Sequence, residues 1–426
     1  MRMSVPVIIS LLLAAPCAAQ ETSTPTAKDS VSELAGALMR SGAISQPDWW
    51  KIVQLRGAEL NAPAKEEKIQ PPAVPQPPTP QPPAAQLSRA PQVPDGVTLK
   101  IGALTQFRYT WADAAPGKTN SSAFAVKTAR IKFSGDLPHN FRYSLQLAFE
   151  RVNTTSTADA ALYDLALTWA PRPDLALTFG QIVMPFGAET TSPTDKLDFV
   201  SRYYAQDRIL NPSGNHDTGA MVSGKAAGGR LQYYAGMFNG KGANYCDNDN
   251  EKFLYAGRLV WAPGKWRLLG HDAELALGAS ALGDSTRGDP SALRSDAGAA
   301  AFTRAYGRYA WGGDLGLRAG PAWVKGEYIS ALLDGQGGDP EVRAYGWHAS
   351  AGYGLLRGKL ELLGRYQVYD PNTAHVTSKD IRWTTLGFNW FVDGHREKVQ
   401  VNYTFKRERA SSVPNDELAA QLQLAF

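Results

Sequence analysis

The 426-residue chain is short of cysteine, of excess charge and of long apolar runs beyond its first residues. Its two cysteines are Cys17 and Cys246, and loss of an N-terminal signal would leave one, which excludes an intramolecular disulfide framework. The formal net charge of +4 is too small to predict nucleic-acid binding. The sequence has no His-Glu-x-x-His, no Gly-x-Ser-x-Gly and no phosphate-cradling glycine loop. We therefore expect no enzyme activity, no catalytic residue and no cofactor.

Two short polar groups resemble functional sites, but each has a simpler interpretation. His216 and Asp217 lie beside an expected strand start, where a loop pair is favoured over part of a catalytic triad. Asp247, Asp249 and Glu251 alternate as in a calcium loop, but a lysine stands where the sharp-turn glycine belongs. We expect no dedicated metal site there, and interpret the stretch as an acidic external loop able to bridge lipopolysaccharide through divalent ions.

The first 19 residues are typical of a secretory signal peptide. A basic start and an apolar run over 5–15 precede the small side chains of residues 17–19. A transmembrane anchor is the alternative, but the run is shorter than the ~20 residues that a spanning helix needs. A lipoprotein function for Cys17 is disfavoured, because Pro16 occupies the place of a small residue. We assign residues 1–19 to the signal peptide.

Two further segments precede the main domain. Residues 20–70 have helical patterns, with Val31, Leu34 and Leu38 on one face, but these helices are too short to bury a core alone. Residues 71–94 contain ten prolines and predict a stiff spacer that reaches about 70 Å at ~3.1 Å per residue. A ligand for a proline-binding module is the alternative interpretation of this linker.

From residue 97 onward, apolar and polar residues alternate along the chain. In the first such stretch, Leu99 and Phe107 lie on one face, and Lys100 and Arg108 lie on the other. The same alternation recurs at 141–150, with Leu145 on the apolar face, and at 398–405, with Val401 on the apolar face. A strand with one apolar and one polar face suits the wall of a transmembrane barrel, apolar toward lipid and polar toward water.

The expected connections alternate between short and long. Short turns are expected at 136–140, 171–174, 225–229, 263–265, 312–313, 356–358 and 393–395. Longer loops are expected at 112–122, 151–159, 184–216, 239–251, 282–297, 330–341, 370–380 and 406–416. Seven turns and eight loops predict an all-β fold over 97–426, a 16-stranded antiparallel transmembrane β-barrel preceded by the short helical segment and the Pro-rich linker. The even strand number places the N-terminal extension in the periplasm, and the strands within 272–323 are the least distinct.

Residues 177–240 carry motifs that resemble a known family. They are Leu177-Thr178-Phe179-Gly180, Met184-Pro185-Phe186-Gly187-Ala188-Glu189, Asp217-Thr218-Gly219 and Tyr234-Ala235-Gly236-Met237-Phe238-Asn239-Gly240. These motifs, and weaker ones over most of 97–426, resemble the phosphate-selective porin O and P family. The closing alternation that ends on Phe426 is similar to the terminal strand of outer-membrane assembly clients. The resemblance implies homotrimers of sixteen-stranded barrels among outer-membrane lipids, and passage of small anions such as phosphate.

Basic residues on the polar strand faces and in the longest loop predict where anions pass. In porins generally the third external loop, here 184–216, folds inward and narrows the channel. The predicted anion-binding and pore-lining residues are Lys100, Arg108, Arg130, Lys132, Arg142, Lys196, Arg202, Arg208 and Arg258. Arg365 and Arg382 are expected to join them, and inward acids such as Glu150, Asp164 and Glu361 are fewer. Rings of arginine and lysine are a means by which pores favour anions.

The sequence therefore predicts an anion-selective diffusion channel in the bacterial outer membrane. Two alternatives stay open: a structural anchor that contacts the cell wall through residues 20–94, and a general porin without phosphate selectivity. In a competing interpretation, the basic residues only solvate a polar lumen, or they pair with the acids of the 184–216 loop, namely Asp195, Asp198 and Asp207.

Overall fold

The computed structural model describes residues 96–114, 119–150, 161–210, 215–245, 247–248, 251–285, 292–298, 306–335, 341–411 and 413–426. The expected signal peptide, helical segment and Pro-rich linker lie outside the described residues, so their boundaries stay predictions. Within the described ranges, no helix is long and apolar enough to cross a membrane.

Among the described residues, seventeen strands form one closed antiparallel sheet. They are β1 (Lys100–Ala112), β2 (Ser121–Leu137), β3 (Phe141–Ala148), β4 (Ala161–Arg172), β5 (Leu175–Val183), β6 (His216–Ala226), β7 (Leu231–Phe238), β8 (Leu254–Trp261), β9 (Lys265–Leu268), β10 (His271–Asp284), β11 (Tyr306–Ala319), β12 (Ala322–Gly335), β13 (Val342–Leu355), β14 (Leu360–Asp370), β15 (Ile381–Asp393), β16 (Glu397–Phe405) and β17 (Glu417–Ala425). β1 pairs with β2 on one side and with β17 on the other, which closes the barrel.

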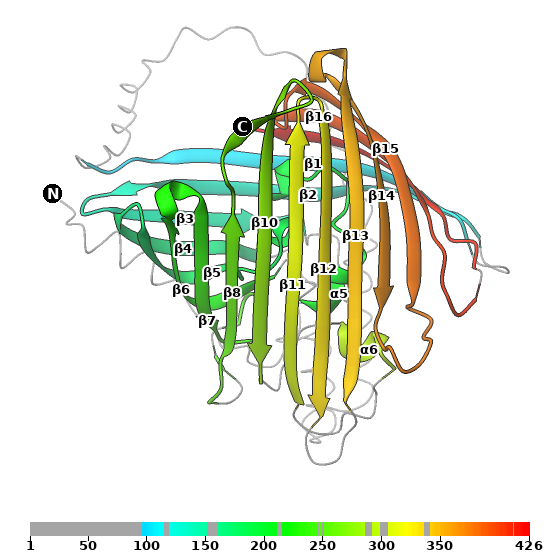
Figure 1. The fold of residues 1–426 in the computed structure, drawn as a ribbon, viewed down its shortest axis with the longest axis horizontal. Coiled ribbons are helices and arrows are strands. Elements are labelled where there is room, and N and C mark those ends of the chain that lie inside the picture. The colour runs from blue at the N-terminus through cyan, green and yellow to red at the C-terminus, as the bar shows by residue number, and fades with distance from the viewer. Residues whose placement is uncertain are drawn as a thin grey trace, which may run out of the picture. The chain divides into compact units, whose positions relative to one another are not determined.

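The seventeen strands occupy sixteen positions in the wall. β8 and β9 both pair with β10, β8 along its second half and β9 along its first, so they act as one interrupted strand. Figure 1 shows β10 to β15 side by side across the front of the barrel, with β1 and β2 passing behind them. The predicted sixteen-stranded antiparallel barrel is confirmed.

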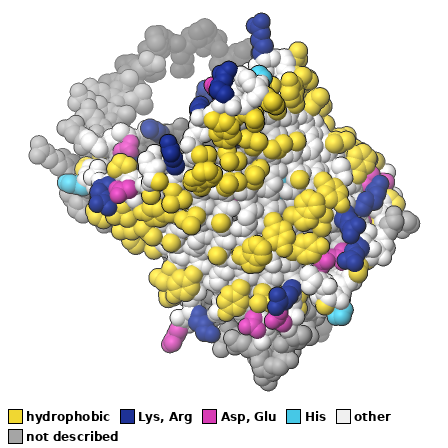
Figure 2. Space-filling model, in the orientation of Figure 1, with side chains coloured by type: hydrophobic (Ala, Val, Ile, Leu, Met, Phe, Trp, Pro, Cys, Tyr) yellow, Lys and Arg dark blue, Asp and Glu magenta, His cyan; other side chains and the backbone are white. Residues whose placement is uncertain are grey.

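Alternation along each strand separates an apolar outer face from a polar inner face. In β1, Ile101 and Phe107 are 59% and 47% exposed on the outer face, whereas Gln106 on the inner face is 3% exposed. The same pattern leaves Trp311 and Leu386 exposed on the outer face. Figure 2 shows apolar side chains spread over the visible wall, with charged side chains gathered toward its edges. This distribution suits a wall that faces hydrocarbon at its middle and water at its rims.

Five of the seven expected short turns lie where the sequence predicted them, and two predictions were wrong. The chain does not reverse at 263–265; this segment only interrupts the strand between β8 and β9, and the turn comes at Leu269 and Gly270, which both have positive φ. Gly312 and Gly313 lie inside β11 and not in a turn, since β11 continues to Ala319.

The connection between β5 and β6 spans residues 184–215 and is here called loop 3; its described part, 184–210 and 215, folds into the barrel. It carries α4 (Ala188–Thr191), η2 (Thr194–Lys196) and α5 (Tyr204–Ile209), while α6 (Leu293–Asp296) belongs to a later connection. Two further single-turn 3-10 helices, η3 (Ala227–Gly229) and η4 (Leu356–Gly358), form short turns. α5 contacts β12, β13 and β14, and Figure 1 shows it behind these strands.

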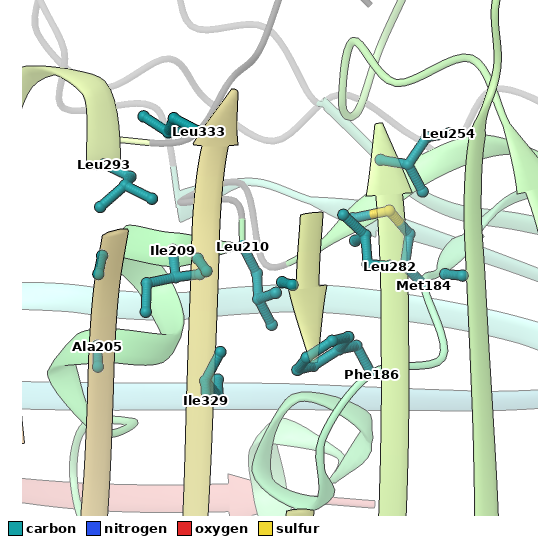
Figure 3. Close-up of a cluster of buried hydrophobic side chains, with 14 of the residues drawn as sticks. Met184, Phe186, Ala205, Ile209, Leu210, Leu254, Leu282, Leu293, Ile329 and Leu333 are labelled. Carbon is teal, nitrogen blue, oxygen red and sulfur yellow. The ribbon is translucent and has the colours of Figure 1, made fainter. Parts of the chain in front are cut away.

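An apolar core lies inside the barrel, between loop 3 and one side of the wall. Figure 3 shows side chains of loop 3 facing those of the strands. The labelled members are Met184, Phe186, Ala205, Ile209 and Leu210 from loop 3, Leu293 from α6, and Leu254, Leu282, Ile329 and Leu333 from the wall. Burial of this cluster holds loop 3 against β8 to β14, since apolar area removed from water stabilises by roughly 25 cal/mol per Å².

Glycines in the wall allow loop 3 to approach so closely. A Cβ on Gly312 would lie 3.2 Å from the Phe186 ring and 2.7 Å from the carbonyl oxygen of Tyr328. A Cβ on Gly346 would lie 2.1 Å from the Cβ of Ala205 in α5. A glycine inside a strand often marks a close backbone approach. This is the physical reason that Gly312 does not mark a turn.

The inner and outer faces of β3 give a direct test of the strand register. Leu145 lies opposite Phe133 and Leu165 on the outer face, whereas Gln146 lies opposite Lys132 and Asp164 on the inner face. We expect Leu145→Arg to lower the free energy of unfolding in a bilayer by ~2–4 kcal/mol, and Gln146→Arg to lower it far less. Urea titration of the barrel refolded in lipid vesicles measures both, and equal losses would show that the register is incorrect.

Candidate functional site: a passage between loop 3 and the wall

Because loop 3 packs against one side of the barrel, space is left on the opposite side, next to β1 to β4. Two cavities lie there, with volumes of ≈ 340 Å³ and ≈ 410 Å³. Five residues line both cavities: Arg130, Tyr163, Thr194, Arg202 and His216. The shared lining places the two cavities next to each other, and together they are here called the passage.

Four cations of the passage come from β1 and β2. Arg108 and Lys127 line the second cavity, Lys132 lines the first, and Arg130 lines both. Lys127 reaches the interior because β2 has a bulge: Gln106 pairs with Thr128 and Phe107 with Val126, so Lys127 is the extra residue. Strict alternation from Arg130 and Lys132 would place Lys127 on the outer face, so the sequence pattern does not predict Lys127 as a pore-lining residue.

Arg130 connects the wall to loop 3 at the junction of the two cavities. Its guanidinium lies 2.6 Å from the Glu150 carboxylate and 3.6 Å from the centre of the Tyr163 ring. It also donates a hydrogen bond of 3.3 Å to the Thr194 hydroxyl of loop 3. This contact joins the wall to loop 3 where the two cavities meet.

Loop 3 contributes a cation from the opposite side. Arg202 lines both cavities, and its guanidinium donates to the backbone oxygens of Glu189 and Ser192. Arg108 likewise donates to the Gln421 amide oxygen and to the Ser201 hydroxyl. Within the described part of the chain, no carboxylate is within salt-bridge distance of the four side chains Arg108, Lys127, Lys132 and Arg202. They leave excess positive charge along the passage.

Acidic side chains also line the passage, but most of them are paired. Glu150 pairs with Arg130, Asp164 lies 2.9 Å from His216, and Asp195 lies 3.4 Å from Lys196. The fourth acid is Asp207 of α5, which faces the second cavity. The passage therefore carries more unpaired basic than unpaired acidic groups.

The geometry of a closed barrel with an inward loop agrees with the family comparison. The model of the family described as "Phosphate-selective porin O and P" matches residues 100–426. The chain belongs to this porin family. Membership makes it an outer-membrane channel protein, and points to a channel rather than to an enzyme.

One curated relative of this porin is distant in sequence. An uncharacterized protein of Aquifex aeolicus is 22% identical over 284 residues, which cover 61% of this chain and 66% of that protein. The match thus spans about two thirds of the length of that curated relative.

Solved structures share the porin fold. An anion-selective porin from Comamonas acidovorans has a TM-score of 0.58 at 12% identity, covering 78% of this chain and all of that one. The outer membrane channel DcaP of Acinetobacter baumannii has a TM-score of 0.53 at 11% identity, covering 78% and 98%. OmpT of Vibrio cholerae in a trimer form has a TM-score of 0.52 at 11% identity, covering 78% and 100%. At these identities the similarity shows the fold alone.

The porin structure brings together four of the nine basic residues predicted to line the pore: Arg108, Arg130, Lys132 and Arg202. Lys100 and Arg142 lie on inner strand faces, opposite Ser134 and Thr168, but outside the two cavities. A role in anion binding stays a prediction for all of them.

The other predicted cations of the porin lie away from the passage. Lys196 is half-exposed beside Asp195, and Arg208 makes two hydrogen bonds of 2.6 Å to Asp296 of α6. Arg258 is buried with Asp314 behind loop 3, at 2.5 Å.

Arg365 and Arg382, which were expected to join the basic lumen, do not line the passage either. Arg365 is buried beside Glu189, at 3.3 Å. The inward placement of Arg382 was wrong: it lies opposite Val368, on the outer face that also carries Leu386.

Asp207 gives this passage an acid that can change charge near neutral pH. Burial raises its pKa to about 6, against the opposing effect of Arg202, while Glu189 raises it further. The carboxylate is therefore mostly ionised at pH 7 and mostly protonated at pH 5.

We expect the ratio of anion to cation permeability to rise as the pH falls from 7 to 5, because the passage loses a negative charge. Reversal potentials in a KCl gradient at both pH values measure this ratio. In Asp207→Asn the rise should be absent, and a variant that keeps the full rise would assign the titration to another group.

Proposed function

We propose that this porin is a diffusion channel that favours small anions, and that they move through the passage between loop 3 and β1 to β4. The supporting observation is the set of four cations without carboxylate partners that line it: Arg108, Lys127, Lys132 and Arg202. Basic rings in a pore lower the energy of a passing anion relative to a cation. Three of these cations come from the wall and one from loop 3, so an anion meets positive charge from both sides.

Phosphate and chemically similar anions fit these groups. A guanidinium can meet two phosphate oxygens in a fork, and a lysine offers a compact charge. Several moderate contacts in series also suit conduction better than one tight site, because the ion must leave as well as enter. The anion-selective Comamonas porin shares the fold, which is consistent with this proposal but does not carry it.

The charge proposal is tested by removing the cations. We expect Arg108→Gln, Lys127→Gln and Lys132→Gln, combined in one chain, to shift the reversal potential toward cation preference and to weaken block of chloride current by phosphate. The matched control removes three exposed cations outside the passage, Arg172→Gln, Lys265→Gln and Arg267→Gln, and should leave both readouts unchanged. A wild-type channel that prefers potassium to chloride would refute the anion proposal and leave the general-porin alternative.

The second candidate function is an anchor that contacts the cell wall through residues 20–94. We further propose that the barrel assembles as a trimer, as the family resemblance implies, and that this segment lies in the periplasm, as the even number of strands predicts. Deletion of 20–94 should leave folding and single-channel conductance nearly intact, because β1 to β17 already close the barrel without it. A wild-type barrel that conducts almost nothing in planar bilayers would favour the anchor.

A further inference from the structure

We propose that Glu327 of β12 is a positioning residue for the passage: it fixes the start of loop 3 against the wall and thereby holds Arg202 where the two cavities meet. This inference rests on the proposed anion channel for its functional readout. Glu327 lies on the side of the barrel away from the passage and lines neither cavity. Its effect on permeation must therefore act through the loop that it binds.

The contacts of Glu327 are made to the backbone of loop 3. Its side chain is directed inward and the residue is only 5% exposed. Carboxylate oxygen Oε2 accepts the backbone N–H groups of Ala188 and Glu189, each at 3.1 Å. The Tyr203 hydroxyl donates to Oε1 at 3.4 Å, so the same carboxylate contacts both arms of the loop. A buried carboxylate that receives several hydrogen bonds is costly to leave without them.

Gly187 allows the loop backbone to rest directly on this carboxylate. Its φ is +72°, and a Cβ there would lie 2.2 Å from Oε1 of Glu327. Its N–H donates to the Ser280 hydroxyl of β10 at 3.1 Å. Any larger residue would therefore separate loop 3 from the wall, and a positive φ would strain it as well.

Glu189 continues the connection from the wall toward the passage. Its carboxylate accepts the Tyr203 N–H at 2.9 Å and lies 3.3 Å from the guanidinium of Arg365, which is buried in β14. Arg365 also donates to the backbone oxygen of Ser201 at 3.0 Å. Ser201 and Tyr203 flank Arg202 in the chain. Ser201 is thus held by Arg365 of the wall, and Tyr203 is held by Glu189.

Arg202 is the last link of this chain of contacts. Its guanidinium donates to the backbone oxygens of Glu189 and Ser192, which belong to the arm of loop 3 that Glu327 fixes. Release of that arm would remove the acceptors that direct Arg202 into the passage. The geometry predicts that loss of Glu327 and loss of Arg202 affect anion preference by the same route.

The experiment is a double-mutant cycle read out by reversal potential in planar bilayers. We expect Glu327→Ala to lower the anion-to-cation permeability ratio by about twofold or more, the range of coupling found within one hydrogen-bond network. Glu327→Gln keeps an acceptor oxygen and should restore most of the preference. In the Arg202→Gln background, adding Glu327→Ala should change the ratio no further.

Two more variants keep the test decisive. Gly187→Ala displaces the loop from its own side and should reproduce the loss, even if Glu327→Ala fails to fold. Asp370→Asn removes another buried carboxylate, one that binds Asn372 and Arg409 and not loop 3, and should leave the ratio unchanged.

The outcomes separate the two proposals. A folded Glu327→Ala channel with the wild-type ratio and conductance, or additive effects of Glu327→Ala and Arg202→Gln, would overturn the positioning role. A wild-type channel without anion preference refutes the channel proposal alone. In that case the conductance and current noise of Glu327→Ala relative to wild type still report whether loop 3 has moved.

Discussion

The backbone ladder between β1 and β17 is the constraint on which the rest of the structure depends. A strand in hydrocarbon has no water to satisfy its N–H and C=O groups, so the sheet must have no open edge. Nine residue pairs from Leu104 with Ala425 to Ala112 with Glu417 provide this closure. Once the sheet is closed, every second side chain along a strand points into an enclosed interior. That interior must be filled either by packed side chains or by water.

Loop 3 divides that interior into a packed side and a wet side. Burial of an unpaired charge is expensive, so cations on the packed side are expected to have partners. Arg258 pairs with Asp314 and Arg308 with Asp284, and all four side chains are at most 5% exposed. On the wet side, water can solvate a cation without a partner, as for Lys132. The division explains why only some of the basic residues of the inner face lack a carboxylate partner.

The sequence predicted the wall better than the interior. Period-two alternation depends only on which face meets lipid, so it placed Arg108, Arg130 and Lys132 on the inner face. The bulge at Lys127 breaks that period and leaves no local signal, since it is defined by pairing with β1. Arg208 carries a charge of the right sign, but its partner Asp296 lies 88 residues away in the chain and is brought near only by the fold.

The glycines and the family motif also have roles that local sequence does not predict, because those roles depend on contacts between distant segments. Two adjacent glycines such as Gly312 and Gly313 are typical of a turn. Only the position of Phe186 shows that β11 needs a residue without a side chain at Gly312. Arg382 lies one residue away from the inner face of β15, and a shift of one residue moves a side chain to the other face. The motif around Gly187 identified the family, but its contact with Glu327 spans 140 residues and could not be derived from either segment alone.

The spacing of the cations along β2 bears on how an anion would move past them. Inner residues two positions apart on a strand, such as Arg130 and Lys132, have their backbones about 7 Å apart, and Lys127 lies about 10 Å from Arg130. The Debye length at physiological ionic strength is ~8 Å, so the fields of neighbouring cations overlap. In the proposed channel, an anion that leaves one cation would already be attracted by the next. Because Arg130 is itself paired with Glu150 where the two cavities meet, the attraction there is weakened where a tight site would otherwise trap the ion.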